Sequence, residues 1–295
     1  MHRDGVRGFN REGLVNVQIN RMARLIFKVH HATKAMSVAF YCSFAEGDFM
    51  PLTCVTMTGA DDKTDPNRLV DIWETYPFVE WAILVGSHTG ERFPSVNWIH
   101  RLVEARERTG NLMRLSLHVC GKFLREIGYG KSTLDEHLGP QLAAFQRVQL
   151  NWHGEKQTFQ VGENVLGAFC RLDGFGWEPE LIFQFDGVND DIWKPAGRRF
   201  ACAGLFDRSH GAGVLPGEWP QASTEIGCGW AGGLGPDNLA DGIPKIAAKA
   251  WPAMNWWIDM ETKVRTDDGT EFDLARVSTC LEIAEPFTAG VLSGT

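Results

Sequence analysis

Several patterns that mark common protein classes are missing from this sequence. Its seven cysteines are scattered, odd in number and free of Cys-X-X-Cys spacing, which argues against a disulfide framework and a zinc knuckle. No apolar run approaches the about 18 residues of a membrane helix, and the amino terminus lacks the apolar core of a secretory signal. We therefore expect free thiols, a cytoplasmic location and no membrane partner.

An excess of basic residues is also missing. The chain has 29 Lys and Arg against 37 Asp and Glu, for a net charge of -8. Proteins that bind a phosphate backbone or an anionic membrane usually carry clustered Lys and Arg. The composition therefore indicates a small-molecule ligand and no nucleic acid. We expect the protein to be a monomer or a homodimer.

The first 49 residues differ from the rest of the chain. Up to Lys34 they contain seven basic residues against only Asp4 and Glu12. Met22, Met36 and Met50 are each a candidate start of translation. We interpret residues 1–49 as a basic, flexible extension and residues 50–295 as one folded domain, with a transit peptide as the alternative for the extension.

From residue 50 onward, short β-rich runs alternate with longer helical patterns. The predicted strands are 52–58, 80–86, 113–120, 145–150, 180–185, 201–206, 226–231 and 255–260, and helical patterns include 65–76, 96–108, 237–250 and 273–284. Eight strands alternating with helices predict an α/β protein of the (β/α)8 TIM barrel type. An open doubly wound sheet is the alternative, disfavoured because no Gly-X-Gly-X-X-Gly fingerprint follows the first strand.

The segments that follow these predicted strands are unusually polar. His153, Asp186 and Asp207 follow the fourth, fifth and sixth strands, and Asp259-Met260-Glu261 ends the eighth. The carboxyl ends of barrel strands meet on one face, where the active site lies. A single aspartate there is often a helix N-cap, and a single histidine is often structural. Their convergence on one face is what predicts a site.

Two glycines end the predicted seventh strand, in the stretch GWAGGLGPDN at 229–238. Gly232 and Gly233 either permit a tight turn or let a ligand approach the backbone closely. The helical pattern that begins near Pro236 would turn its positive end toward a bound anion. We favour phosphate binding over a turn without a ligand.

In this order the motifs resemble those of the phosphoribosylanthranilate isomerase family, (β/α)8 barrels that act on a phosphorylated sugar conjugate. The similar segments are Glu91-Arg92-Phe93-Pro94-Ser95, Gln149-Leu150 with His153-Gly154-Glu155, Leu205-Phe206-Asp207 with Gly211-Ala212-Gly213, and 231–238. The resemblance spans residues 50–285 and implies a similar barrel, a phosphorylated small-molecule substrate and no cofactor or metal ion.

The resemblance also implies residue roles. Asp207 would be the general acid and Arg92 would pair with the carboxylate of the substrate, with His153 beside it. The phosphate would be bound by Gly232, Gly233, Thr262 and Lys263. Asp186 has no counterpart in the family, and its place at a strand end makes it a further candidate for substrate binding.

The general base departs from the family pattern. The family has a cysteine at the end of the first strand, where this chain has Thr58. A threonine hydroxyl is a far poorer base than a thiolate. Cys120, at the end of the third strand, is a better-placed candidate than Cys54, which would lie about 13 Å deeper than Thr58. The catalytic candidates are therefore Asp207, Thr58 and Cys120.

Three functions remain open at this point. The favoured one is an isomerase-like enzyme, an intramolecular oxidoreductase with altered chemistry or substrate. The second is a noncatalytic barrel that binds a phosphorylated metabolite. The third is a hydrolase or lyase in which Asp186, Asp207, Asp259 and Glu261 hold Mg²⁺ or Mn²⁺.

Overall fold

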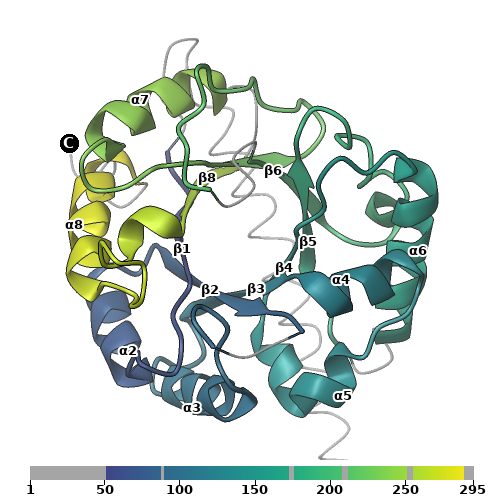
Figure 1. Cartoon of the computed structure of the whole chain (residues 1–295), viewed down its shortest axis with the longest axis horizontal. Helices are drawn as coiled ribbons and strands as arrows, with labels where there is room; N and C mark the ends of the chain where they lie inside the picture. The colour runs from purple at the N-terminus through teal and green to yellow at the C-terminus, as the bar shows by residue number, and fades with distance from the viewer. Residues whose placement is uncertain (1–50, 88–89, 173–175, 208–211, 251–254, 289–295) are drawn as a thin grey trace, which may run out of the picture. The chain divides into compact units, whose positions relative to one another are not determined.

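The computed structural model describes residues 51–87, 90–172, 176–207, 212–250 and 255–288. Eight parallel strands pair in sequence order and form a closed barrel, which Figure 1 shows end on, with helices around it. The first strand pairs with both the second and the eighth. The predicted (β/α)8 barrel is confirmed, and the open-sheet alternative is wrong because the sheet has no edge strand.

The predicted strands agree with those of the structure to within two residues at each end. The strands are β1 (Cys54–Thr58), β2 (Val79–Val85), β3 (Arg114–Val119), β4 (Arg147–Leu150), β5 (Glu180–Phe185), β6 (Cys202–Phe206), β7 (Gly227–Ala231) and β8 (Trp256–Met260). The α-helices are α2 (Pro66–Thr75), α3 (Val96–Glu107), α4 (Gly121–Gly128), α5 (Leu134–Leu138), α6 (Thr158–Leu172), α7 (Leu239–Ala250) and α8 (Leu274–Ala284). Short 3₁₀ turns are η1 (Gly139–Ala144), η3 (Ala196–Arg198), η4 (Thr262–Val264) and η5 (Glu285–Phe287). Residues 212–226, the described part of the β6–β7 connection, contain no helix.

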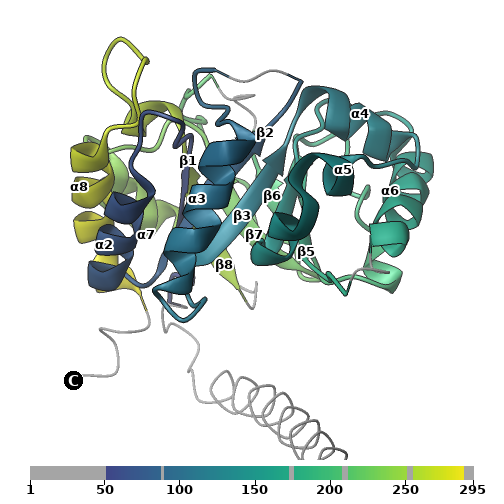
Figure 2. The ribbon, with the colours of Figure 1, turned by 90° about the horizontal axis from the view of Figure 1, so that it is seen from below.

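Local sequence sets where several helices begin. Asp65 caps α2 by accepting a hydrogen bond from the Asn67 amide, and Ser95 caps α3 by accepting one from the Trp98 amide. Asp273 caps α8 in the same way. Each of these helices follows a strand and its connecting loop and runs back alongside the barrel, as α2 and α3 do in the side view of Figure 2.

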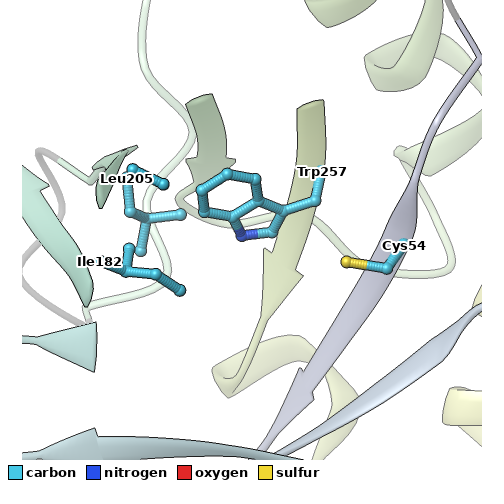
Figure 3. Close-up of a cluster of buried hydrophobic side chains, with 5 residues drawn as sticks. Cys54, Ile182, Leu205 and Trp257 are labelled. Carbon is cyan, nitrogen blue, oxygen red and sulfur yellow. The ribbon is translucent and has the colours of Figure 1, made fainter. Parts of the chain in front are cut away.

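The middle of the barrel is apolar. Its core cluster comprises Cys54, Ile182, Ala203, Leu205 and Trp257. Figure 3 shows the Trp257 ring between the aliphatic side chains of Ile182 and Leu205 and the thiol of Cys54. A Cβ atom on Gly229 of β7 would lie 2.2 Å from Trp257 Cε2, so this glycine makes room for the indole.

A charged cluster fills the end of the barrel at which the strands begin. Arg147 Nη1 lies 3.0 Å from Glu80 Oε1, and Arg147 Nε lies 2.8 Å from Glu180 Oε2. The guanidinium also stacks 4.0 Å from the Trp257 ring centroid, and Thr56 donates a hydrogen bond to Glu80. The cation here is therefore matched by carboxylates of the same chain.

Other predictions concern the chain as a whole. No helix in the described ranges is long and apolar enough to cross a membrane. The six cysteines in the described ranges are free thiols, and Cys42 lies outside those ranges. The predicted extension, residues 1–49, also lies outside them.

Candidate functional site

A cavity of about 360 Å³ is formed by residues at the carboxyl ends of the strands. Eight predicted site residues line it: Arg92, Cys120, His153, Asp207, Gly232, Gly233, Thr262 and Lys263. They come from six different strand ends and their loops, so closure of the barrel is what brings them together. Further lining residues are His118, Gln149, Asn151, Gln184, Asp259 and Glu261.

Asp207 presents a well-supported carboxylate to this cavity. It is 8% exposed and accepts a 2.8 Å hydrogen bond at Oδ2 from Gln184 Nε2. Gln184 lies on the neighbouring strand β5 and is itself buried. The amide therefore fixes the orientation of the carboxylate, as an acid–base group requires.

Thr58, predicted as a candidate base, lies outside the cavity wall. It is 1% exposed, does not line the cavity and donates a 2.7 Å hydrogen bond to Asp259 Oδ1. A hydroxyl that is buried and already donating its proton to a carboxylate cannot take a proton from a ligand. The contact of Thr58 with Asp259 is that of a residue that positions a carboxyl group and not that of a base.

Asp259 is a further candidate site residue, which was not among the predicted catalytic residues. Burial is the main cause that raises its pKa to about 8, with the charges of Glu261 and Asp207 adding to it and the Thr58 hydrogen bond opposing it. Asp259 is therefore largely protonated at neutral pH. A protonated carboxyl in the wall of a cavity can act as a proton donor.

Cys120 and His118 lie together on the β3 side of the cavity. Burial raises the pKa of the Cys120 thiol to about 11, although the Asn151 amide lies 3.3 Å from the sulfur and favours the thiolate. Burial also lowers the pKa of His118 to about 3, and Gln149 Nε2 lies 3.3 Å from its Nδ1. At neutral pH both groups are uncharged, so neither the predicted Cys120 thiolate nor an imidazolium is available.

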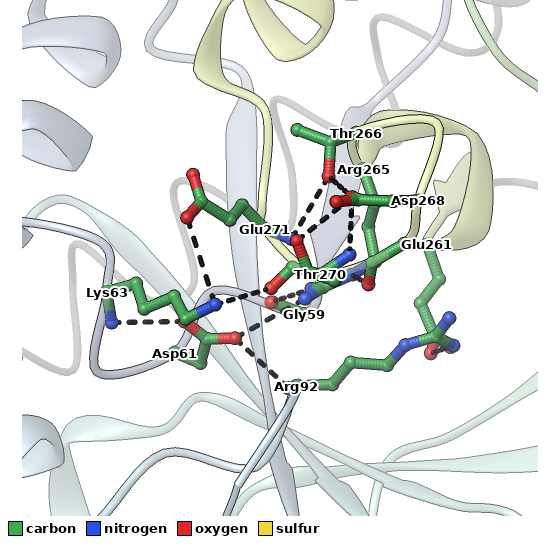
Figure 4. Close-up of polar contacts among 11 residues, drawn as sticks. Gly59, Asp61, Lys63, Arg92, Glu261, Arg265, Thr266, Asp268, Thr270 and Glu271 are labelled. Atoms are coloured by element: carbon green, nitrogen blue, oxygen red, sulfur yellow. Dashed lines mark hydrogen bonds and ion pairs between the residues drawn. The ribbon is translucent and has the colours of Figure 1, made fainter.

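Arg92 and Glu261 form an ion pair in the wall of the cavity. Arg92 Nη1 lies 2.8 Å from Glu261 Oε1, and the two side chains are 30% and 27% exposed. Burial raises the pKa of Glu261, and the Arg92 charge opposes that rise. Figure 4 shows how this pair joins a polar network that includes Asp61 and Arg265. The guanidinium predicted to bind a substrate carboxylate therefore already has a carboxylate partner.

The glycine pair after β7 forms a bend with φ angles of 119° at Gly232 and 64° at Gly233. Asn238 closes the loop by accepting from the Gly235 amide at 3.0 Å and donating to the Gly233 carbonyl at 2.9 Å. Within the described ranges, no hydrogen bond involves the backbone N–H of Gly232 or Gly233. Two unpaired amides in the wall of a cavity are suited to an anion.

Gly233 also has a packing reason to be glycine. A Cβ atom there would lie 2.6 Å from the Leu215 nitrogen and 2.8 Å from the Gly213 carbonyl oxygen. The space that a side chain at Gly233 would occupy is therefore filled by the β6–β7 loop and is not available to a ligand. Both explanations of the sequence motif, a tight bend and an accessible backbone, hold at this position.

Lys263 and Thr262 complete this side of the cavity. Lys263 is exposed and, among the described residues, makes no hydrogen bond or ion pair. Thr262 begins the short turn η4 and lines the same wall. The ammonium group of Lys263 is therefore available to an anionic ligand.

Asp186 is the predicted binding residue that the structure places elsewhere. It is absent from the cavity wall and accepts hydrogen bonds from the backbone amides of Gly154, Val188 and Asn189. Although partial burial raises its pKa, these amides lower it more strongly. Asp186 therefore stabilises two adjoining loops, and its carboxylate does not face the cavity in which it was predicted to bind substrate.

The metal-dependent alternative finds no support in this arrangement. In the described ranges, no group of three or more His, Cys, Asp or Glu side chains is placed to hold a metal ion. Three of the four carboxylates proposed as ligands are bound to other groups of the protein. Asp186 accepts hydrogen bonds from loop amides, Asp259 accepts one from Thr58, and Glu261 forms an ion pair with Arg92.

Three supporting residues were not among the predicted site residues. His118, Gln149 and Gln184 line the cavity, and each is the penultimate residue of its strand, two positions before the residue that follows the strand. Side chains two apart on a strand face the same side. A polar residue at that spacing inside an otherwise apolar strand is the sequence signal that could have identified these three residues.

Comparison with known proteins leaves the chain without a family. No protein-family model and no curated protein matches it. Among solved structures, it resembles a phospho-2-dehydro-3-deoxyheptonate aldolase from Thermotoga maritima, with 11% identity and a TM-score of 0.45 over 80% of this chain and 69% of that one. It also resembles a GH113 β-1,4-mannanase, with 10% identity and a TM-score of 0.48 over 80% of this chain and 98% of that one.

A structure of KDPGal is similar at 12% identity, with a TM-score of 0.43 over 80% of this chain and 96% of that one. Likenesses this distant do not bear on activity, and none of the three is a phosphoribosylanthranilate isomerase. What the chain can be assigned to is the fold that its own strand pairing defines, an eight-stranded parallel (β/α)8 barrel.

Proposed function

We propose that this barrel is an enzyme that acts on a phosphorylated sugar-like metabolite by general acid–base chemistry of the isomerase type. The observation that carries this proposal is that one cavity contains the carboxyl groups of Asp207 and Asp259 and the backbone amides of Gly232 and Gly233, which have no hydrogen-bond partner among the described residues. The two carboxyl groups suit proton transfer to and from a substrate, and the two backbone amides suit binding of its phosphate.

The two carboxyl groups have different environments and therefore different roles. Asp259, with its pKa raised to about 8, holds a proton at neutral pH and would donate it to a substrate oxygen. Asp207, oriented by Gln184, would accept a proton from the neighbouring carbon. This reverses the acid role that the family resemblance implies for Asp207, and it needs neither Thr58 nor a Cys120 thiolate.

The phosphate end of the substrate would lie at the loops after β7 and β8. Barrel enzymes often bind phosphate there through backbone amides. Here the amides of Gly232 and Gly233 and the ammonium of Lys263 lie in one wall of the cavity. Asp259, when protonated, adds no negative charge that would repel the anion.

A noncatalytic binding barrel is the second candidate. One observation favours it: the groups that replace the cysteine base of the family, Thr58 and Cys120, are respectively engaged with Asp259 and protonated. In that case the cavity would bind a phosphorylated metabolite without turnover.

Assays with phosphoribosylanthranilate and a panel of aldose and ketose phosphates test the proposal. We expect conversion of at least one compound, and Asp207→Asn or Asp259→Asn should lower kcat about 10²- to 10⁴-fold. Asp241→Asn, on the exposed first turn of α7, is the matched control and should leave kcat unchanged. Binding of a sugar phosphate without any turnover would establish the second candidate instead.

A further inference from the structure

The backbone of Arg92 is held in an uncommon conformation. Its φ angle is 73°, in the left-handed region that non-glycine residues rarely adopt. The Arg92 amide donates a 3.1 Å hydrogen bond to Asp61 Oδ2, and Arg265 Nη2 lies 3.4 Å from the same oxygen. Arg265 is fully buried and also donates to the Gly59 carbonyl at 2.7 Å. The loop is thus fixed by groups from the loops that follow β1 and β8.

The Arg92 side chain uses only part of its hydrogen-bonding capacity in its contact with Glu261. Arg92 makes one hydrogen bond to Glu261, from Nη1 to Oε1, whereas a guanidinium can hold a free carboxylate through two parallel bonds. Both side chains line the cavity and remain partly exposed, so a ligand can reach them. A ligand carboxylate can therefore offer Arg92 a better partner than Glu261 does.

The surroundings of Glu261 decide what happens when it leaves Arg92. The acidic groups near it are Asp207, which follows β6, and Asp259 of β8, and the Cys120 thiol, which follows β3, is also near. The positive groups are Arg92 from the β2 loop and Arg265 from its own loop, and Lys263 lies two residues further along in the same wall. Arg265 is committed to Gly59 and Asp61. Without Arg92, Glu261 is a partly buried carboxylate beside other acids, a setting that favours its protonated form.

We propose that Glu261 is an internal competitor for Arg92: it occupies the guanidinium while the cavity is empty and yields it, with uptake of one proton from solvent, to the carboxylate of a phosphorylated sugar acid. This inference rests on the proposed function for the phosphate end of the ligand. A phosphate at the glycine bend and a carboxylate at Arg92 are substrate features that the family resemblance already implies, and Glu261 adds competition for the second of them. Proton uptake makes binding of the carboxylate weaker as the pH rises.

Two ligands that differ only at one carbon test the substrate class. 6-Phosphogluconate ends in a carboxylate where sorbitol 6-phosphate ends in a hydroxymethyl group, and both share the titration of the phosphate. Calorimetric titration of the wild type from pH 6 to pH 8 should show the affinity ratio of the two ligands falling by at least fivefold as the pH rises. Glu261→Gln should bind 6-phosphogluconate at least tenfold more tightly at pH 8, with a ratio independent of pH.

The proton itself can be counted. Titrations with 6-phosphogluconate in buffers of different ionisation enthalpy should report uptake attributable to Glu261 in the wild type and its loss in Glu261→Gln. Unchanged or weaker binding of 6-phosphogluconate by Glu261→Gln would overturn the inference. Glu271→Gln is the matched control, because Glu271 is an exposed carboxylate on the same β8–α8 connection, and it should behave as the wild type.

Acetate separates this inference from the proposed function, because it needs no phosphate site. We expect Glu261→Gln to bind acetate at least fivefold more tightly than the wild type at pH 8, and the double variant Arg92→Gln/Glu261→Gln to lose that binding. Equal binding of acetate by the wild type and Glu261→Gln, or no binding by either, would overturn the inference. If acetate behaves as expected but neither sugar phosphate binds, the proposed function fails and the competitor role of Glu261 stands. Thermal unfolding of each variant verifies that it is folded.

Discussion

The two ends of this barrel hold similar charged groups in different states of pairing. Where the strands begin, Arg147 lies between Glu80 and Glu180 and stacks on Trp257. Where they end, carboxyl groups outnumber cations in the cavity wall: Asp207, Asp259 and Glu261 face Arg92 and Lys263. The charges at the first end are paired with one another, whereas the second end has a protonated acid together with an ammonium group and backbone amides that have no partner in the part of the chain that the structure describes.

The difference shows that charge inside a barrel does not by itself mark a site. A buried charge with complete partners serves structure, because removing either partner leaves the other in a poorly solvating interior. Groups whose partners are missing or replaceable are the ones that can serve a ligand. The pairing of each group, more than its residue type, separates the cluster around Arg147 from the cavity.

The largest expected effect tests this contrast through stability. Arg147→Met leaves Glu80, which is 1% exposed, without its cation, and should lower the free energy of unfolding by about 3–5 kcal/mol. Arg92→Gln breaks the ion pair at the other end, where both side chains are partly exposed, and should cost less than about 1 kcal/mol. Urea denaturation of both variants measures the difference, and similar losses would contradict the comparison.

The pH dependence of stability sharpens the comparison at the cavity end. The pKa of Asp259 is about 8 in the folded protein and about 3.9 when unfolded, so between these values only the folded state keeps the proton. The contribution of Asp259 to the free energy of unfolding is therefore fully present below the unfolded pKa. It falls by about 1.4 kcal/mol per pH unit as the pH rises from there to the folded pKa.

Urea denaturation of the wild type and Asp259→Asn at pH 5, 6 and 7 isolates this contribution. Relative to the variant, the wild type should lose about 3 kcal/mol of unfolding free energy from pH 5 to pH 7. A difference that stays constant with pH would show that Asp259 is ionised in the folded protein, and the acid role proposed for it would then fail.

The smallest expected effect concerns the glycine bend. Gly233 and Gly110 have φ angles of 64° and 62°, but a Cβ atom meets the Leu215 nitrogen only at Gly233 and finds open space at Gly110. Gly110→Ala should cost about 1 kcal/mol from backbone strain, and Gly233→Ala about 2 kcal/mol or more because the β6–β7 loop must also move. Gly233→Ala should in addition weaken binding of inorganic phosphate. Equal losses of unfolding free energy in the two variants would mean that the β6–β7 loop moves away from the new Cβ atom without an energetic penalty.

The fold was accessible from the sequence to a large extent. Eight apolar runs bounded by polar tips predict eight strands, and caps such as Asp65 and Ser95 predict where helices begin, because these signals act between residues close in the chain. Eight of the ten predicted site residues line the cavity, since strand-end position alone places a residue on the correct face.

The roles within the site were less accessible. Thr58 and Asp259 are 201 residues apart and Arg92 and Glu261 are 169 apart, so no local pattern indicates that they meet. Asp186 illustrates the opposite error: its position after β5 is correct for a site residue, yet three backbone amides take its carboxylate. Strand-end position predicts proximity to the site, and contacts decide use.

The sequence by itself determined the (β/α)8 barrel, the face on which polar groups gather and the place of the glycine bend, because periodicity, capping and backbone freedom are local properties. Only the tertiary structure decided which carboxyl keeps a proton, which arginine already has a partner and which thiol stays neutral. Those states depend on burial and on charges brought together by closure of the barrel, and both arise from contacts between residues far apart in the chain.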